Sequence, residues 1–255
     1  MSNDMRVLDL FSGIGGFSLG LERAGMRTVA FCEIEPFCRA VLRKHWPGVP
    51  IFDDVCALGS ASLAAVESID VICGGFPCQD ISHAGRRAGL DGERSGLWRE
   101  YARLIGYIRP RFVIVENVAA LTVRGLLGVL GDLTEMRYDA EWCVLGADAL
   151  GASQHRERLW LLAYPDDAGF QGPIWAWQPL ASRDQWTTSY REPLRSNCGY
   201  WPPGPRAVDD IPRMADGPAN RVDRLRALGN AVVPQIPEII GRAIMRAEEM
   251  RDAAV

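Results

Sequence analysis

Two kinds of apolar pattern alternate over the first two thirds of the chain, and together they predict a fold of strands and helices. Short continuous apolar runs are typical of buried strands, whereas apolar residues spaced three or four apart are typical of helices that cover a core. The runs predict strands at 6–10, 28–34, 69–75, 111–118, 141–147 and 157–165. The periodic segments predict helices at 17–25, 35–48, 96–110 and 126–138. Such alternation favours an α/β fold with a parallel, doubly wound sheet.

The pattern changes after residue 165. Residues 166–212 are rich in Trp, Pro, Gly, Ser and Arg and show little periodicity. Disordered segments contain few aromatic residues, so the tryptophans at 175, 177, 186 and 201 favour a small irregular lobe. Helical periodicity returns at 221–250, and its last part predicts an amphipathic helix. We therefore expect a main domain at 1–165, a small lobe at 166–212, and a return to the main domain at 213–255.

Composition limits the class of protein. The chain has 255 residues, of which 48% are hydrophobic, and this is enough for one sizeable core. It starts with a polar segment and has no run that could cross a bilayer, so we expect a soluble protein of the cytoplasm with no membrane partner. Its seven cysteines match neither a disulfide framework nor zinc spacing, so we expect mostly structural thiols and no metal site.

Charge is distributed unevenly along the chain. The formal net charge of −4 argues weakly against a nucleic-acid partner. Between residues 83 and 111, however, seven arginines accompany only three acids, which allows a basic face on an acidic body. Arginine suits bidentate contacts with phosphates and guanine. The simpler interpretation is a solvated surface, and the sequence leaves both interpretations open.

Three glycines lie between the first strand and the first helix, in "DLFSGIGG". Glycine lets the backbone approach a ligand closely, and a helix N-terminus helps to orient that ligand. Asp9 and Phe11, just before the glycines, suit an adenosine-type ligand with a polar or cationic tail. Glu33 ends the second strand, where an acid commonly binds ribose hydroxyls. The spacing is not GxGxxG, and a tight turn without a ligand is the alternative, but together with Glu33 the turn favours a nucleoside-type cofactor.

A cysteine follows the strand at 69–75, in "GGFPCQ". A free cysteine is usually a small buried residue, but Cys78 comes at the carboxyl edge of the sheet, where such folds place their sites. Glu116 and Asn117 of "ENV" are expected at the same edge, and a carboxylic acid beside a thiolate suits nucleophilic catalysis. The glycine-rich, basic segment that follows Cys78 resembles a lid over an anionic substrate.

These motifs together resemble one known family. "DLFSGIGG", "GGFPCQ", "ENV", "QHRER" and "GNAVVP" occur in the order and roughly the spacing of the DNA (cytosine-5)-methyltransferases, over most of the chain. The combination is highly specific, although each motif alone is modest evidence. The resemblance implies a Rossmann-like, S-adenosylmethionine-dependent methyltransferase sheet with a small target-recognition lobe. It also implies double-stranded DNA as the substrate.

The resemblance assigns roles to the catalytic residues. Cys78 would add to C6 of cytosine, which activates C5 for methylation, and Glu116 would contact N3. Arg158 would hold the base together with Arg156, and the base must leave the helix for this chemistry. The residues assigned to DNA contacts are Gln79, Ser82, Arg86 and Arg87.

The resemblance also assigns a cofactor site for S-adenosylmethionine. Its amino-acid and adenine parts would lie near the glycine turn, its ribose near the acid that ends the second strand, and its adenine near the short strand of "IFDDV". The residues implied are Phe11, Gly13, Ile14, Gly16, Glu33, Ile34, Asp54, Val55, Pro77, Leu97, Asn230 and Ala231.

Some features depart from the family pattern or leave alternatives open. Ser153 stands before Gln154 where the family often has proline, and the short lobe constrains target recognition poorly. A tRNA cytosine methyltransferase is one alternative, although no "CFT" triplet is present. A non-catalytic DNA-binding relative is another. A dinucleotide-dependent dehydrogenase would explain the first turn but not "PCQ" and "ENV". We expect a monomeric, nucleoid-associated bacterial or phage enzyme that works beside a cognate restriction endonuclease or alone.

Overall fold

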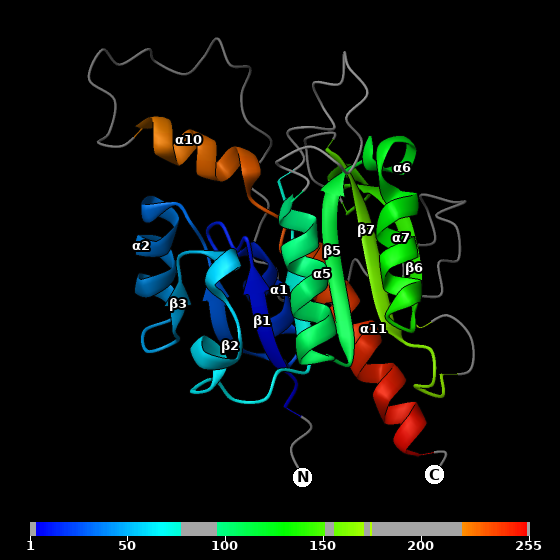
Figure 1. The fold of residues 1–255 in the computed structure, drawn as a ribbon. Coiled ribbons are helices and arrows are strands. Elements are labelled where there is room, and N and C mark those ends of the chain that lie inside the picture. The colour runs from blue at the N-terminus through cyan, green and yellow to red at the C-terminus, as the bar shows by residue number, and fades with distance from the viewer. Residues whose placement is uncertain (1–3, 78–95, 151–155, 171–173, 175–220, 254–255) are drawn as a thin grey trace.

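The computed structural model describes residues 4–77, 96–150, 156–170, 174 and 221–253 (Figure 1). The lobe expected at 166–212 therefore lies almost wholly outside the described residues. Its first residues are described and belong to the main body, because Phe170 packs against Phe112 and Tyr164. The backbone amide of Ile174 donates a hydrogen bond of 2.7 Å to Glu141.

A seven-stranded sheet forms the centre of the described structure, in the order β3-β2-β1-β4-β5-β7-β6. Six of its strands coincide with the predicted apolar runs to within a few residues, and the two-residue β3 is additional. They are β1 (Arg6–Leu10), β2 (Arg27–Cys32), β3 (Ile51–Phe52), β4 (Val71–Gly74), β5 (Phe112–Val118), β6 (Tyr138–Gly146) and β7 (Glu157–Pro165).

The expectation of a wholly parallel sheet is wrong at one edge. The strands β3, β2, β1, β4 and β5 are parallel, whereas β7 runs antiparallel to both of its neighbours, β5 and β6. Residues 147–156 join β6 to β7 and begin with the short helix η2 (Ala147–Leu150). A parallel pair needs a crossover of a dozen residues or more, which this connection is too short to provide.

Helices cover both faces of the sheet, and Figure 1 shows α5 and α7 on one face with α1 and α11 on the other. The first face is packed by Leu8, Leu10 and Trp98, and the second by Val7 and Ile240. Successive residues of β1 thus point to opposite faces, as the pleat requires. The helices are α1 (Gly16–Arg23), α2 (Pro36–His45), η1 (Val55–Ala57), α3 (Ser60–Leu63), α5 (Gly96–Ile108), α6 (Leu121–Arg124), α7 (Leu126–Glu135), α10 (Arg221–Asn230) and α11 (Gln235–Asp252).

The C-terminal helix returns to the first helix of the chain through unusually close contacts. A methyl group added at Gly20 of α1 would lie 2.2 Å from the carbonyl oxygen of Pro234. One added at Gly241 of α11 would lie 2.7 Å from the Cβ atom of Ala24. Because only glycine permits this approach, α11 lies directly on α1 and brings the segment before it to the end of β1.

The described residues also limit other kinds of site. No helix among them is long and apolar enough to span a membrane. Within the same ranges, no group of three His, Cys, Asp or Glu side chains is arranged to hold a metal ion. Among the described cysteines, at positions 32, 38, 56, 73 and 143, no disulfide is formed.

Candidate functional site

A cavity of about 620 Å³ opens at the carboxyl ends of the parallel strands. Its wall comes from segments far apart in sequence, because the ends of β1, β2, β4 and β5 meet there with the start of β7 and with α10. Twelve residues predicted from the sequence line it, namely Phe11, Gly13, Glu33, Ile34, Asp54, Val55, Pro77, Leu97, Glu116, Arg156, Arg158 and Asn230. The fold therefore brings most of the predicted residues together.

The carboxylate of Glu33 fixes the backbone of the glycine turn. The amide of Gly13 donates to Glu33 Oε2 at 2.6 Å, and the amide of Glu35 donates to Glu33 Oε1 at 2.8 Å. Gly15 has φ 86°, and a side chain there would lie 2.6 Å from the Trp46 ring. The turn thus requires glycine, and the nearly buried Glu33 carboxylate is fixed beside it at the end of β2.

The expectation that Asp9 faces a ligand is wrong. Asp9 is fully buried on the other side of β1, where its carboxylate accepts hydrogen bonds from the amide and the hydroxyl of Ser18, at 3.3 and 2.7 Å. Burial raises its pKa to about 8, although the bonds to Ser18 oppose the rise. Phe11, two residues later, does line the cavity. Asp9 therefore stabilises the glycine turn indirectly, because its hydrogen bonds with Ser18 hold the start of α1 in place.

Glu116 lies opposite this turn, near the end of β5. Its Oε1 atom is 2.9 Å from Arg158 Nε, on the neighbouring antiparallel strand. Burial raises the pKa of Glu116, while Arg158 and Arg156 oppose that rise. A methyl group at Gly75 would lie 2.7 Å from Glu116 Oε2, so the glycine after β4 makes room for the carboxylate. Glu116 is thus a nearly buried acid that gains a proton more readily than a free glutamate.

Asn117 joins Glu116 to the strand that precedes Cys78. Its Nδ2 atom donates to the carbonyl of Phe76 at 3.0 Å, and its Oδ1 atom accepts from the amide of Val118 at 2.9 Å. Pro77 follows Phe76 and lines the cavity, and it is the last described residue before position 96. The predicted nucleophile and DNA contacts, Cys78, Gln79, Ser82, Arg86 and Arg87, lie outside the described residues.

Three of the predicted cofactor residues do not line the cavity. Among the described residues, Ile14, Gly16 and Ala231 lie outside its lining. Gly16 is used for packing, because a methyl group there would lie 2.6 Å from the carbonyl oxygen of Val232. This contact seats the segment after Asn230, which does line the cavity.

Sequence reasoning missed several lining residues. Asp223 and Ala227 precede Asn230 by seven and three positions on α10, so helical spacing from "GNAVVP" could have found them. Six others lie within two positions of a predicted residue, namely Cys32, Glu35, Asp53, Gly75, Phe76 and Val118. Phe37 and Cys38 come from α2, and Asn117, which was expected at this edge with Glu116, lines the cavity as well.

Three arginines of the basic segment at 83–111 make tertiary contacts. Arg103 donates to the carbonyl of Val55, Arg109 donates to the carbonyl of Met136, and Arg111 forms an ion pair with Glu248. These contacts join residues that are far apart in the sequence, so the local count of charges could not reveal them. The arginines at 103 and 109 are nevertheless exposed, so the basic-face interpretation stays open.

A family model settles the relationship that the motifs suggest. The model for C-5 cytosine-specific DNA methylases matches residues 5–191, which is well over half of the chain. The chain belongs to this family. Two curated relatives are a Bacillus subtilis type II methyltransferase, M2.BsuMI, at 38% identity over 167 residues, and an Escherichia coli type II methyltransferase, M.Eco47II, at 34% over 174 residues. These matches cover 62% and 65% of this chain but only 42% and 41% of the relatives.

Solved structures agree with the family fold. A prophage-encoded E. coli protein described as a candidate DNA modification methyltransferase matches with a TM-score of 0.57 and 26% identity, over 67% of this chain and 49% of that one. The methyltransferase EhMeth of Entamoeba histolytica has a TM-score of 0.58 over 68% of this chain and 56% of that one. At 17% identity, the second match speaks for the fold alone. The α/β, Rossmann-like methyltransferase fold is thereby established.

Proposed function

We propose that the chain is an S-adenosylmethionine-dependent DNA (cytosine-5)-methyltransferase. Glu116 carries the proposal, because a nearly buried acid paired with Arg158 lies in the same cavity as the glycine turn and Glu33. Methylation of a base requires an acid that can protonate the ring and, beside it, a pocket for the cofactor. Membership in the family supports the same reaction.

The cavity fits the proposed cofactor. Its volume of about 620 Å³ lies within the range that holds small-molecule ligands. Glu33, fixed by two backbone amides, can accept hydrogen bonds from ribose hydroxyls, since a carboxylate has lone pairs left after two bonds. Phe11 and Ile34, which is 72% exposed, offer apolar surface for a flat base. The carboxylates of the lining suit a sulfonium cation, and the bound cofactor would supply an electrophilic methyl group.

The protein groups would act on the cytosine ring. A Cys78 thiolate would form a bond to C6 while Glu116 donates a hydrogen bond or its proton to N3, so that the electrons of the ring collect at C5. Once C5 carries the methyl group, a base takes the C5 proton, the C5–C6 double bond re-forms as Cys78 leaves as thiolate, and a proton given to N3 returns to Glu116. Burial raises the pKa of Glu116, which favours the protonated form that this donor role needs.

Arg156 and Arg158 would hold the base and orient Glu116. Both line the cavity at the start of β7, and Arg158 contacts Glu116 directly. Burial and the neighbouring Arg158 lower the pKa of Arg156. Double-stranded DNA is the proposed substrate. Because the curated relatives are type II methyltransferases, a restriction endonuclease is a proposed functional partner.

Transfer of a labelled methyl group tests the function. The protein is incubated with labelled S-adenosylmethionine and duplex DNA, RNA or no nucleic acid, and the product nucleosides are separated. We expect label in 5-methyldeoxycytidine, its loss in Cys78→Ala, and its retention in Cys143→Ala, a thiol on β6 outside the cavity lining. Label in RNA would favour the tRNA alternative. Tight DNA binding without transfer to any nucleic acid would overturn the proposal in favour of a binding protein.

A further inference from the structure

Two arginines hold one wall of the cavity without lining it. Arg39 on α2 donates from one Nη atom to the carbonyls of Glu33 and Ile34, at 3.1 and 2.7 Å. Arg103 on α5 donates from Nη2 to the carbonyl of Val55, at 3.1 Å. All three carbonyls belong to residues that line the cavity, whereas neither guanidinium does. The arginines therefore act on the wall from behind.

The two segments that they hold are short. Each also has other contacts, because the amide of Glu33 donates to the carbonyl of Phe52 at 2.9 Å and the side chain of Val55 is buried in the core. The first follows β2 and contains Glu33 and Ile34, and the second follows the two-residue strand β3 and contains Asp54 and Val55. Side-chain caps shape each segment locally, because Glu33 accepts from the amide of Glu35 and Asp54 accepts from the amide of Cys56. Together these contacts hold the segments to the glycine turn, to each other and to the core.

The arginine bonds add one further anchor to each segment. Arg39 ties the first segment to α2, and Arg103 ties the second to α5, the helix whose residue Leu97 lines the cavity too. Arg103 is itself held by Glu100, with Nε 2.6 Å from the carboxylate. A guanidinium–carbonyl bond is charge-assisted and rigid in geometry, so it fixes a loop better than a neutral contact.

We propose that Arg39 and Arg103 are positioning residues that hold the cavity wall in its binding-competent form, and so set the affinity for S-adenosylmethionine. The proposal rests on the proposed function for the identity of the ligand. Without the bonds, the two segments sample other positions, and the apparent affinity falls in proportion to the competent fraction. The rate of methyl transfer at saturating cofactor does not depend on them, because neither arginine reaches the reacting atoms.

The first arm of the test measures cofactor binding and kinetics. Arg39→Ala and Arg103→Ala are each expected to raise the dissociation constant of S-adenosylmethionine by about 5- to 20-fold, as for loss of a charge-assisted hydrogen bond. KM for the cofactor should rise likewise while kcat stays unchanged, and Arg39→Lys and Arg103→Lys should restore part of the affinity. Arg137→Ala is the matched control, because Arg137 forms an exposed ion pair with Asp166 away from the cavity.

The second arm measures the backbone dynamics of the cavity wall in the cofactor-free protein. Hydrogen exchange of the full-length, cofactor-free protein should accelerate in peptides covering 33–36 for Arg39→Ala and 53–58 for Arg103→Ala, but not in peptides of β5. Wild-type affinity and exchange in both alanine variants would overturn the inference. Failure of the wild type to bind S-adenosylmethionine would instead overturn the proposed function, and exchange would then still decide whether the arginines hold the wall.

Discussion

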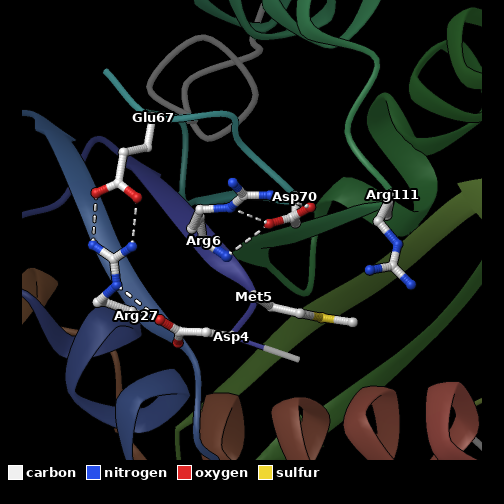
Figure 2. Close-up of a pocket in the computed structure, with 7 residues that line it drawn as sticks. All are labelled: Asp4, Met5, Arg6, Arg27, Glu67, Asp70 and Arg111. Carbon is white, nitrogen blue, oxygen red and sulfur yellow. Dashed lines mark hydrogen bonds and ion pairs between the residues drawn. The ribbon is translucent and has the colours of Figure 1, made fainter. Parts of the chain in front are cut away.

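The two edges of the parallel sheet contain similar charged side chains but arrange them differently. At the amino edge, a depression of about 340 Å³ is lined by Arg6, Arg27, Arg111 and their acidic neighbours, shown in Figure 2. Arg6 lies 2.7 Å from Asp70, Arg27 lies 2.7 Å from Glu67, and Arg111 pairs with Glu248 on α11. Each arginine there is neutralised by a carboxylate of the fold.

The carboxyl edge keeps its groups facing an open cavity. Glu116 and Arg158 form one ion pair, but Arg156, Glu33 and Asp54 face the same space from other elements. Ligands of such folds bind in the crevice outside the carboxyl ends of the strands. At the amino ends of this sheet, the arginines are instead paired with carboxylates. A cluster of charges is therefore weak evidence for a site until its partners are known.

The largest expected effect comes from removing the acid at the carboxyl edge. Glu116→Gln should lower kcat by about 100-fold or more, because the side chain can no longer transfer a proton to N3. Glu67→Gln at the amino edge should leave kcat unchanged. Both are measured by methyl transfer at saturating cofactor and DNA. Equal rates for the wild type and Glu116→Gln would remove the distinction between the edges.

The next largest effect is expected from filling the space that Gly75 leaves beside Glu116. In Gly75→Ala, the new methyl group would lie 2.7 Å from Glu116 Oε2, so the carboxylate must shift. We expect about a tenfold loss of kcat, since small misplacements of a catalytic group are costly. The melting temperature should change little, because the atom displaced is the end of a side chain. Gly131→Ala is the control, since nothing lies within 4 Å of a methyl group there. Unchanged kcat in Gly75→Ala would show that the carboxylate tolerates the shift.

A buried acid below the glycine turn should make stability depend on pH. Burial raises the pKa of Asp9 from 3.8 to about 8, so the folded protein keeps a proton that the unfolded chain releases. The free energy of unfolding should therefore fall as pH rises between about 4 and 8, by up to about 1.4 kcal/mol per pH unit. Urea unfolding at several pH values measures this slope, and Asp9→Asn should flatten it. An identical slope in Asp9→Asn would assign the pH dependence to other groups.

The smallest effect is expected at the amino edge. Arg6→Met removes a partly exposed ion pair with Asp70 and should cost about 1 kcal/mol or less in the free energy of unfolding. Methyl transfer should be unchanged, because the pair lies at the opposite end of the strands from the cavity. Urea unfolding and a transfer assay on the same preparation test both statements. A loss of activity larger than the loss of folded protein would indicate that the amino edge has a functional role.

Local sequence patterns predicted most of the strands and the chemical character of the glycine turn. Apolar runs located β1, β2, β4, β5, β6 and β7 because burial requires them, and the glycine turn indicated close backbone approach before any coordinates. The antiparallel β7 could not be predicted, because strand direction depends on the length and path of the connection at 147–156. The position of Asp9 was also missed, because its side of the strand is decided by which helix packs there.

What the sequence by itself determined is the family, the order of the elements, and which residues have the right chemistry for a cavity at the carboxyl edge. Only the tertiary structure decided which of those residues meet: Glu116 with Arg158, Gly75 with Glu116, and Gly16 with Val232 instead of a ligand. It also showed which backbone carbonyls or carboxylates Arg39, Arg103 and Arg111 contact. The physical reason is that hydrogen bonds and ion pairs act over a few ångströms, between residues that the chain separates by dozens of positions.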